Sequence, residues 1–185
     1  MDIGVLALQG AVQEHERVLA RLGARTRQVR LPADLEGLAG IVLPGGESTV
    51  MARYLREYRL DLALRERAQT GLAFFGVCAG AILLCREVDG EPGVLGLLPA
   101  RAQRNAYGRQ MNSFVALANG PAGTFHGLFI RSPKLEPLEG TEVLASLPDG
   151  QPVMLRWGKV LAAAFHPELA GDDRAHSLFL KSAWG

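Results

Sequence analysis

Cysteine is scarce in this chain, with only Cys78 and Cys85 among 185 residues. If both lie on one helix and its entry turn, two helical turns hold them about 10 Å apart, too far for a disulfide. A disulfide-stapled secreted fold is therefore excluded. Cys85 is best interpreted as a small buried hydrophobic residue. Because reduced thiols are typical of a reducing compartment, we expect a cytoplasmic protein.

An excess of charge and long apolar runs are also lacking. The formal net charge is +1, from 20 Lys and Arg against 19 Asp and Glu. We therefore expect no nucleic-acid partner and no attraction to an anionic membrane. The first apolar run, over residues 3–8, is too short to cross a membrane and follows no basic segment of the kind found in secretion signals.

The chain length and its 48% hydrophobic content are typical of one globular domain, so we expect residues 1–185 to form a single domain. Apolar runs alternate with helical segments in the first half, which predicts a parallel α/β sheet. Closely spaced strands follow, with two turns short enough for hairpins. The expected strands cover residues 3–8, 25–31, 40–43, 72–75, 110–118, 123–131, 141–147, 152–157 and 160–165. The expected helices cover residues 12–22, 48–57, 60–70, 79–85 and 172–183.

The most informative segment is Gly76-Val77-Cys78-Ala79-Gly80. It joins an apolar strand to an apolar helix and frames one cysteine with small residues, which is the sulfur version of a nucleophile elbow. Such a sharp turn strains the backbone of the nucleophile and leaves no room for Cβ atoms on its neighbours. It also sets the thiol near a helix N-terminus, which favours the thiolate. The alternative is a buried cysteine in a glycine-rich packing turn.

A thiol nucleophile needs a base, and the base needs an orienting partner. Of the four histidines, only His166 has a suggestive setting, between Phe165 and Pro167-Glu168 at the end of an apolar strand. Pro167 favours extended backbone at the residue before it, and residues i and i+2 of an extended segment point to the same side. We therefore expect Glu168 to orient His166 toward the thiol. Taken alone, the segment could also be a strand that ends in a surface histidine and a solvated glutamate.

A third segment, Pro44-Gly45-Gly46-Glu47-Ser48, also follows an expected strand. Adjacent glycines let backbone N–H groups approach a ligand closely. Thioester chemistry passes through an oxyanion that needs two donors, and the N–H groups of Gly46 and Ala79 are the candidates. No Gly-Lys-Ser/Thr follows, which excludes a phosphate loop, whereas a plain Gly-Gly turn remains the alternative. All three segments follow strand ends, where ligands bind in open parallel sheets.

With these motifs, the chain resembles the class I (triad) glutamine amidotransferases, and among them the glutaminase subunits of pyridoxal 5′-phosphate synthases. The elbow and the His-Pro-Glu sequence are shared across the class. Val77 departs from the pattern, because many relatives have threonine there. The strings that single out the subgroup are Leu8-Gln9-Gly10, Pro44-Gly45-Gly46-Glu47-Ser48, Arg104-Asn105-Ala106-Tyr107-Gly108 and Ile130-Arg131-Ser132-Pro133. Together the matching segments span nearly the whole chain.

The resemblance implies an open mixed sheet of the flavodoxin-like type, with helices on both faces. It implies hydrolysis of L-glutamine to L-glutamate and ammonia, with Cys78 as nucleophile, His166 as base and then acid, and Glu168 as orienting group. It implies neither a cofactor nor a metal. An arginine fork suits the α-carboxylate of the substrate, and a carboxylate such as Glu47 suits its α-ammonium. The implied glutamine site consists of Gly46, Glu47, Ser48, Arg104, Ile130 and Arg131.

The resemblance further implies that ammonia passes to a separate synthase subunit that builds the pyridoxal ring. It places Gln9 and Gly10 at the surface where that subunit docks, although the same pair could be a plain strand-to-helix turn. A glutaminase that is always active would waste glutamine. We therefore expect the Gly45–Gly46 peptide to be misaligned in the free protein and to turn its N–H inward when the partner docks.

Three other interpretations remain open at this point. The ammonia could feed another synthase, as in histidine or purine biosynthesis. The chain could be a stand-alone thiol hydrolase or peptidase of related fold, which would not need the paired Arg104 and Arg131. It could also be a non-catalytic binding module, against which the intact Cys78, His166 and Glu168 argue.

Overall fold

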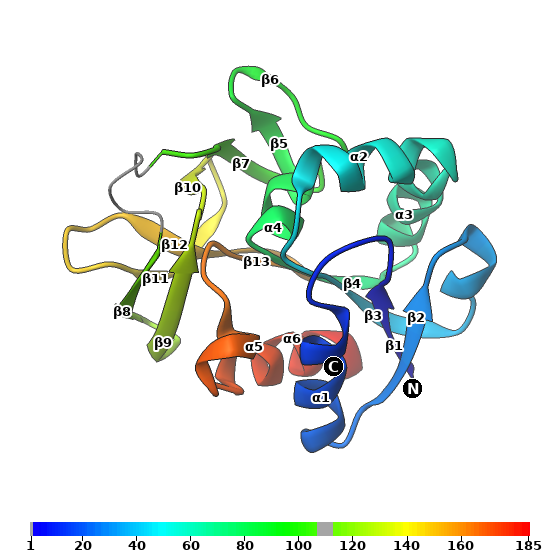
Figure 1. Cartoon of the computed structure of the whole chain (residues 1–185), viewed down its shortest axis with the longest axis horizontal. Coiled ribbons are helices and arrows are strands. Elements are labelled where there is room, and N and C mark those ends of the chain that lie inside the picture. Colours follow the sequence, from blue (N-terminus) through cyan, green and yellow to red (C-terminus); the bar gives the residue numbers. More distant parts are fainter. Residues whose placement is uncertain (1, 107–112) are drawn as a thin grey trace.

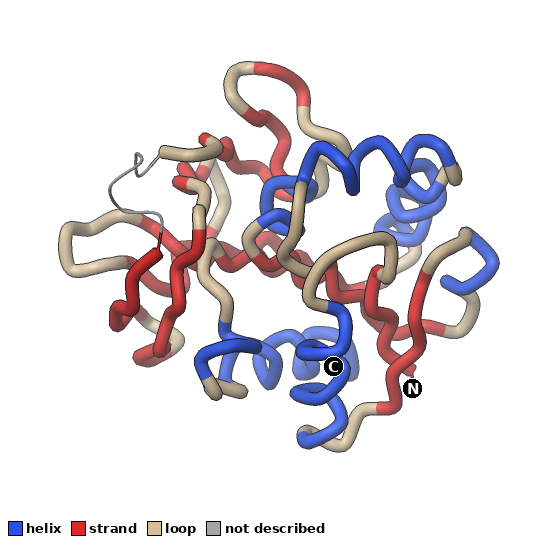
Figure 2. The backbone as a smooth tube through the Cα atoms, viewed as in Figure 1, coloured by secondary structure: helices blue, strands red, loops and turns tan. Residues whose placement is uncertain are grey.

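The computed structural model describes residues 2–106 and 113–185, and its central element is a nine-stranded sheet (Figures 1 and 2). The strand order is β2-β1-β3-β4-β13-β12-β11-β8-β9. The strands from β2 to β13 are parallel, and each strand from β13 to β9 is antiparallel to the next. Their bounds are β1 Asp2–Leu6, β2 Arg25–Val29, β3 Leu38–Leu43, β4 Ala73–Val77, β8 Ser113–Gly120, β9 Gly123–Ile130, β11 Glu142–Ser146, β12 Pro152–Trp157 and β13 Val160–Ala163.

Helices cover both faces of this sheet (Figure 1). One face carries α1 (Val12–Arg21), α5 (Pro167–Ala170) and α6 (Arg174–Trp184). The other face carries α2 (Ser48–Glu57), α3 (Leu60–Gln69) and α4 (Ala79–Leu84), with a short 3₁₀ turn over Pro32–Leu35 joining β2 to β3. A second, four-stranded sheet lies beyond α4 in the order β10-β7-β5-β6. Its strands are β5 Cys85–Val88, β6 Glu91–Pro92, β7 Leu98–Gln103 and β10 Lys134–Pro137.

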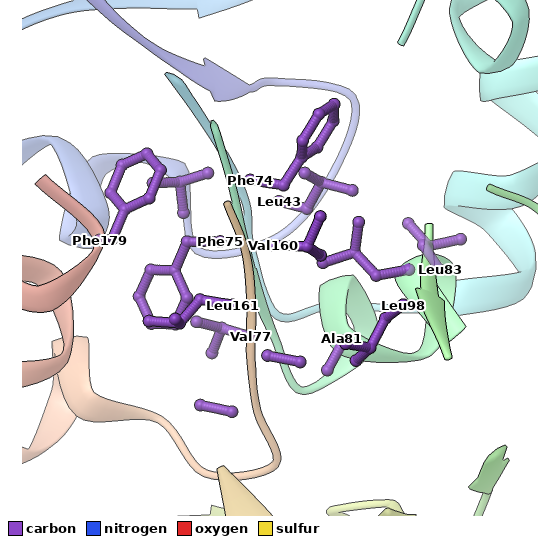
Figure 3. Packing of buried hydrophobic residues seen from close by; sticks show 14 of the residues in the cluster. Leu43, Phe74, Phe75, Val77, Ala81, Leu83, Leu98, Val160, Leu161 and Phe179 are labelled. Carbon is purple, nitrogen blue, oxygen red and sulfur yellow. The ribbon is translucent and has the colours of Figure 1, made fainter. Parts of the chain in front are cut away.

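The middle of the large sheet is buried on both sides, as a parallel sheet between helices requires. Every residue of β4 is buried. Phe75 stacks on Phe179 of α6, with ring centroids 5.8 Å apart, whereas Phe74 points to the opposite side, which α4 covers (Figure 3). Each such side chain contributes about 1.5–3 kcal/mol by leaving water. This core holds the carboxyl ends of β3, β4 and β13 in place.

The structure confirms the parallel α/β arrangement of the first half and the two predicted hairpins, β11–β12 and β12–β13. Both cysteines are free, as expected, and Cys85 is buried as predicted, while Cys78 is buried as well. Among the described helices, none is long and apolar enough to cross a membrane. The first part of the strand expected over residues 110–118 lies outside the described residues.

In the middle of the chain, one expectation was wrong and one feature was missed. Cys85 does not end the helix after the elbow but begins strand β5. The second sheet was not predicted at all, because β5 and β7 carry charged residues and β6 has only two residues. Such short polar strands lack the apolar alternation that identifies a strand, so their pairing is decided by tertiary contacts.

A pair of glycine substitutions tests how closely α4 packs on β3. A Cβ at Gly80 would lie 1.9 Å from the Leu43 carbonyl oxygen, whereas a Cβ at Gly71 has no atom within 4 Å. In a helix, alanine is normally more stable than glycine by about 1 kcal/mol. At Gly80 we expect alanine to be the less stable residue, with Gly80→Ala losing about 3 kcal/mol of unfolding free energy. The reason is that the backbone carbonyl of Leu43 cannot move aside as a side chain can.

Gly71→Ala is the matched control for this test. Gly71 has a φ of +94°, so alanine there costs about 1–2 kcal/mol of backbone strain alone. Urea unfolding of the two variants measures both losses. A Gly80→Ala protein as stable as Gly71→Ala would contradict the close approach of α4 to β3.

Candidate active site

Cys78 forms the sharp turn between β4 and α4 that its sequence predicts. Its φ of 49° and ψ of −102° are unusual for a residue with a side chain and cost about 1–3 kcal/mol. The turn is held from both sides. The Cys78 N–H donates to the Ala163 carbonyl at 2.8 Å, and the Cys78 carbonyl accepts from the Ile82 N–H at 3.1 Å. The strained strand-to-helix turn predicted at Cys78 is thereby confirmed.

The small residues around Cys78 have a steric reason. A Cβ at Gly76 would lie 2.6 Å from the carbonyl carbon and oxygen of Gly80, and a Cβ at Gly80 would strike the Leu43 carbonyl. Both distances are shorter than van der Waals contact allows. Only glycine at these two positions lets α4 start so close to the strands, and this places the Cys78 thiol above their carboxyl ends.

His166 follows β13, the strand next to β4. Its N–H donates to the Leu128 carbonyl at 2.8 Å, which fixes the backbone of the loop. Its Nδ1 lies 2.7 Å from Oε1 of Glu168, whose side chain is fully buried. Because an ionised carboxylate can only accept, Nδ1 carries the proton of this bond, and Nε2 is the nitrogen left for the thiol.

The local geometry of His-Pro-Glu differs from the expected extended segment. Pro167–Ala170 is the short helix α5, and His166 is the residue before its first turn. Proline fits the first position of a helix, where its missing N–H has no partner to lose. Glu168 therefore reaches His166 from the first turn of α5. The pairing of imidazole and carboxylate is as predicted, but the extended backbone was wrong.

The surroundings of His166 favour its charged form. Burial by itself lowers the pKa of this imidazole, but hydrogen bonds to Cys78 and Glu168, together with the negative charges of the two groups, raise it to about 10. The hydrogen-bonded neighbours thus outweigh desolvation. An imidazole held between a thiol and a carboxylate is placed to exchange a proton with the thiol. The thiol also lies 3.8 Å from the Ile130 carbonyl oxygen.

Gly45 and Gly46 pack directly against this group. A Cβ at Gly45 would lie 2.4 Å from Cε1 of His166, and a Cβ at Gly46 would lie 2.3 Å from Oε1 of Gln9. That same Gln9 oxygen accepts the Glu47 N–H at 2.7 Å. Sequence reasoning explained the glycines by access for a ligand. The structure adds that the histidine ring and the glutamine side chain occupy the space where side chains would stand.

The loop between β1 and α1 holds the same segment from the other side. The Gly45 carbonyl accepts the Ala11 N–H at 3.1 Å, and a Cβ at Gly10 would lie 1.9 Å from that carbonyl oxygen. Gly10 has a φ of +101°, which glycine alone adopts at little cost. Any rotation of the Gly45–Gly46 peptide must therefore break the bond to Ala11. The orientation of this peptide in the free protein stays a prediction.

A cavity of about 530 Å³ opens over Cys78 and His166, a size within the range of small-molecule sites. The structure brings every expected substrate residue to it, while Glu168 lies behind His166 and Gln9 behind Gly46. The lining residues named in the prediction are Gly10, Gly46, Glu47, Ser48, Cys78, Ala79, Arg104, Ile130, Arg131 and His166. A larger hollow of about 710 Å³ lies on the second sheet, away from the thiol.

The charged residues of the cavity are arranged in two pairs. Arg131 Nη1 lies 3.8 Å from Glu47 Oε1, and both side chains are more than half exposed. Arg104 is held by Asp89, which accepts its backbone N–H at 2.9 Å and its Nε–H at 2.6 Å. Burial raises the pKa of Asp89, but the bonds from Arg104 outweigh it and lower the pKa.

Sequence reasoning missed Asp89, and only the turn sequence Asp89-Gly90 signalled a tight loop there. The aspartate takes the Nε edge of Arg104, and no hydrogen bond from the described residues occupies the two terminal amino groups. Arg104 is one of the residues that line the cavity. Tyr107 and Gly108, the last two residues of the predicted motif, lie outside the described residues. For a bound metal, the described residues offer no cluster of three or more suitable side chains.

Comparison with known proteins gives consistent relatives over the full length. The chain is 52% identical to pyridoxal 5′-phosphate synthase subunit PdxT from a strain of Thermus thermophilus, covering 98% of this chain and 97% of that one. It is 50% identical to the subunit of the same name from Deinococcus radiodurans, covering 97% and 96%. A solved glutamine amidotransferase superposes on all of it with a TM-score of 0.94 at 47% identity.

A more distant structure, PurLQS from Thermotoga maritima, has a TM-score of 0.75 at 16% identity over 97% of each chain, a likeness of fold alone. A family model also matches nearly the whole chain, because residues 5–184 correspond to the SNO glutamine amidotransferase family. With the elbow cysteine, the histidine and the buried glutamate in place above a mixed α/β sheet, the chain belongs to the SNO glutamine amidotransferase family.

Proposed function

We propose that this protein is the glutaminase subunit of a pyridoxal 5′-phosphate synthase and that Cys78, His166 and Glu168 form its catalytic triad. The observation that carries the proposal is the buried pairing of His166 with Glu168 beside the elbow thiol, at the base of the cavity. The names of the full-length relatives support the partner. We further propose that residues 1–185 form one glutaminase domain that works in the cytoplasm, where its two free thiols stay reduced.

The chemistry proceeds in two halves. The Cys78 thiolate attacks the side-chain carbonyl carbon of glutamine, and the carbonyl oxygen becomes an oxyanion that the N–H groups of Ala79 and Gly46 stabilise. His166 then gives its proton to the amide nitrogen, and the C–N bond breaks. Ammonia departs, and the acyl group remains on Cys78 as a thioester. In the second half, His166 takes a proton from water, the hydroxide attacks the thioester, and glutamate leaves as the thiol is restored.

The charged pair Glu47–Arg131 fits the two ends of an amino acid. The side chains lie 3.8 Å apart at the mouth of the cavity, and both are largely exposed, so the pair is weak and opens at little cost. The α-ammonium of glutamine then replaces Arg131 as the partner of Glu47, and the α-carboxylate replaces Glu47 as the partner of Arg131. The free amino groups of Arg104 complete the carboxylate site, while Ser48 and Ile130 line the walls.

Control by the synthase subunit follows from the contacts of the β1–α1 loop. Gln9 holds the Glu47 N–H, and Ala11 holds the Gly45 carbonyl. A subunit that docks on Gln9 and Gly10 can therefore turn the Gly45–Gly46 peptide and bring the Gly46 N–H into the oxyanion site. The synthase also receives the ammonia directly, because in water it would become ammonium and cease to be a nucleophile.

Substitution of the proposed triad tests the chemistry. We expect Cys78→Ser to keep the fold and lose nearly all turnover, because a hydroxyl is far less ionised than an activated thiol. His166→Ala should lower kcat by about 10²–10⁴-fold, and Glu168→Gln should cost less, since it removes no reacting group. A glutamine-derived affinity label should modify Cys78 and spare the buried Cys85. Full activity of Cys78→Ala would refute the mechanism.

Substitution of the arginines tests the substrate site. Arg131→Ala should raise the KM for glutamine by about 10- to 100-fold, the loss of one charge-assisted pair at a desolvated site. Arg104→Lys should bind glutamine less tightly than the wild type, because the lysine ammonium cannot make the planar double contact that arginine makes. Arg56→Ala, on the outer side of α2, is the control and should leave KM unchanged. An unchanged KM in Arg131→Ala would remove Arg131 from the substrate shell.

The partnership is tested by glutaminase assays with and without the synthase subunit. We expect the isolated chain to be slower by about 10²–10³-fold, the usual loss of one oxyanion donor. Glutamine labelled with ¹⁵N in its amide should place ¹⁵N in the pyridoxal ring even when unlabelled ammonium is present in excess. Equal rates with and without the partner would contradict the switch. Activation that survives Gly46→Ala undiminished would exclude the peptide flip as its cause.

A further inference from the structure

Two buried histidines lie behind the proposed triad, and the proposed mechanism does not use them. His15 is on α1 and His176 is on α6, and neither is exposed. His15 Nδ1 lies 2.8 Å from His176 Nε2, which is a hydrogen bond. On its other side, His15 Nε2 lies 3.8 Å from Glu168 Oε1. Glu168 is thus placed between the ring of His166 and the ring of His15.

The buried polar atoms of this group are incompletely paired. Among the described residues, His15 Nε2, His176 Nδ1 and Glu168 Oε2 are buried side-chain atoms without a hydrogen-bond partner. Leaving such an atom unpaired is unfavourable, so a buried donor beside a buried carboxylate is drawn toward it. A shift of less than about 1 Å brings His15 Nε2 within hydrogen-bond distance of Glu168. That movement gives His15 Nε2 a partner and gives the Glu168 carboxylate a second hydrogen-bond donor.

The position of each proton follows from the carboxylate at the end of the chain. Burial lowers the pKa of His15 well below its usual value and that of His176 to about 4, so both rings are neutral at pH 7 and each has one N–H. An ionised carboxylate only accepts, so the His15 proton is on Nε2 and its Nδ1 is an acceptor. His176 must then donate from its own Nε2. The Nε2–H of His176 then points to His15 Nδ1, and the Nε2–H of His15 points to Glu168.

We propose that His15 is a positioning residue, which donates its Nε2–H to Glu168 and holds the carboxylate aligned against Nδ1 of His166. His176 acts one step further out by keeping His15 in the tautomer that donates. The inference rests on the proposed triad. Its physical reason is that Oε1 of Glu168 can swing away from the imidazole when it has a single donor, whereas a second donor to the same oxygen holds it in place.

Two substitutions of His15 separate the donated hydrogen bond from simple packing. The terminal amide nitrogen of glutamine reaches the position of Nε2, whereas asparagine reaches only that of Nδ1. We expect His15→Asn to lower kcat about 10-fold, the typical loss of a hydrogen bond to a charged group. The KM for glutamine should not change, because His15 does not line the cavity. His15→Gln should keep kcat within about threefold of the wild type, since it retains the donor.

The assay uses the complex with the synthase subunit, and His166→Ala is measured beside the His15 variants. An inactive His166→Ala with a fully active His15→Asn would overturn this inference and leave the triad intact. A fully active His166→Ala would overturn the triad itself. Equal losses of kcat in His15→Gln and His15→Asn, or a change confined to KM, would also overturn the role of the donated bond.

A second measurement needs no variant. Nitrogen chemical shifts of ¹⁵N-histidine-labelled protein report which ring nitrogen carries the proton. We expect both His15 and His176 to be neutral, with the proton on Nε2. A His15 ring protonated on Nδ1 has no donor for Glu168 and would overturn the inference, whatever the activities of the variants.

Discussion

The parallel pairing of β4 with β13 is the contact on which the active site depends. Val77 pairs with Ala163 at the ends of these strands, and the Ala163 carbonyl accepts the N–H of Cys78. Cys78 and His166 therefore follow two neighbouring strands at the same edge of the sheet, although they are far apart in the sequence. The buried phenylalanines of β4 keep this edge rigid, and the cavity, the elbow and the loop of His166 are all built on it.

Several glycines let the backbone segments around that edge meet more closely than side chains would allow. Gly80 admits α4 against β3, Gly45 admits the ring of His166, and Gly10 admits the Gly45 carbonyl. The cost is a loss of chain entropy on folding, to which the strained Cys78 adds about 1–3 kcal/mol. A domain stability of about 5–15 kcal/mol tolerates such a site only because the core around it is complete.

The charge states of the buried histidines depend on which groups lie beside them. Glu168 and His166 are both buried, yet the hydrogen bonds between them and with Cys78 hold the pKa of His166 at about 10. Behind Glu168 stand two imidazoles that burial keeps neutral. They can donate hydrogen bonds without adding a charge that would compete with His166 for the carboxylate. α1 carries one of them, and its preceding loop also holds the Gly45–Gly46 segment, so one element contacts both halves of the proposed machinery.

Much of this was readable from the chain alone, because the features concerned are local. Runs of buried apolar residues predicted the parallel strands, and small residues around Cys78 predicted the strained turn. His166 and Glu168 were paired correctly although residues 166–168 were predicted to be extended, because His166 lies before α5 and Glu168 in its first turn still reaches the ring. The second sheet, the hold of Asp89 on Arg104 and the place of His15 behind Glu168 gave no such signal. Each joins residues that are distant in sequence, and only the packing of helices and strands brings such residues within hydrogen-bond distance.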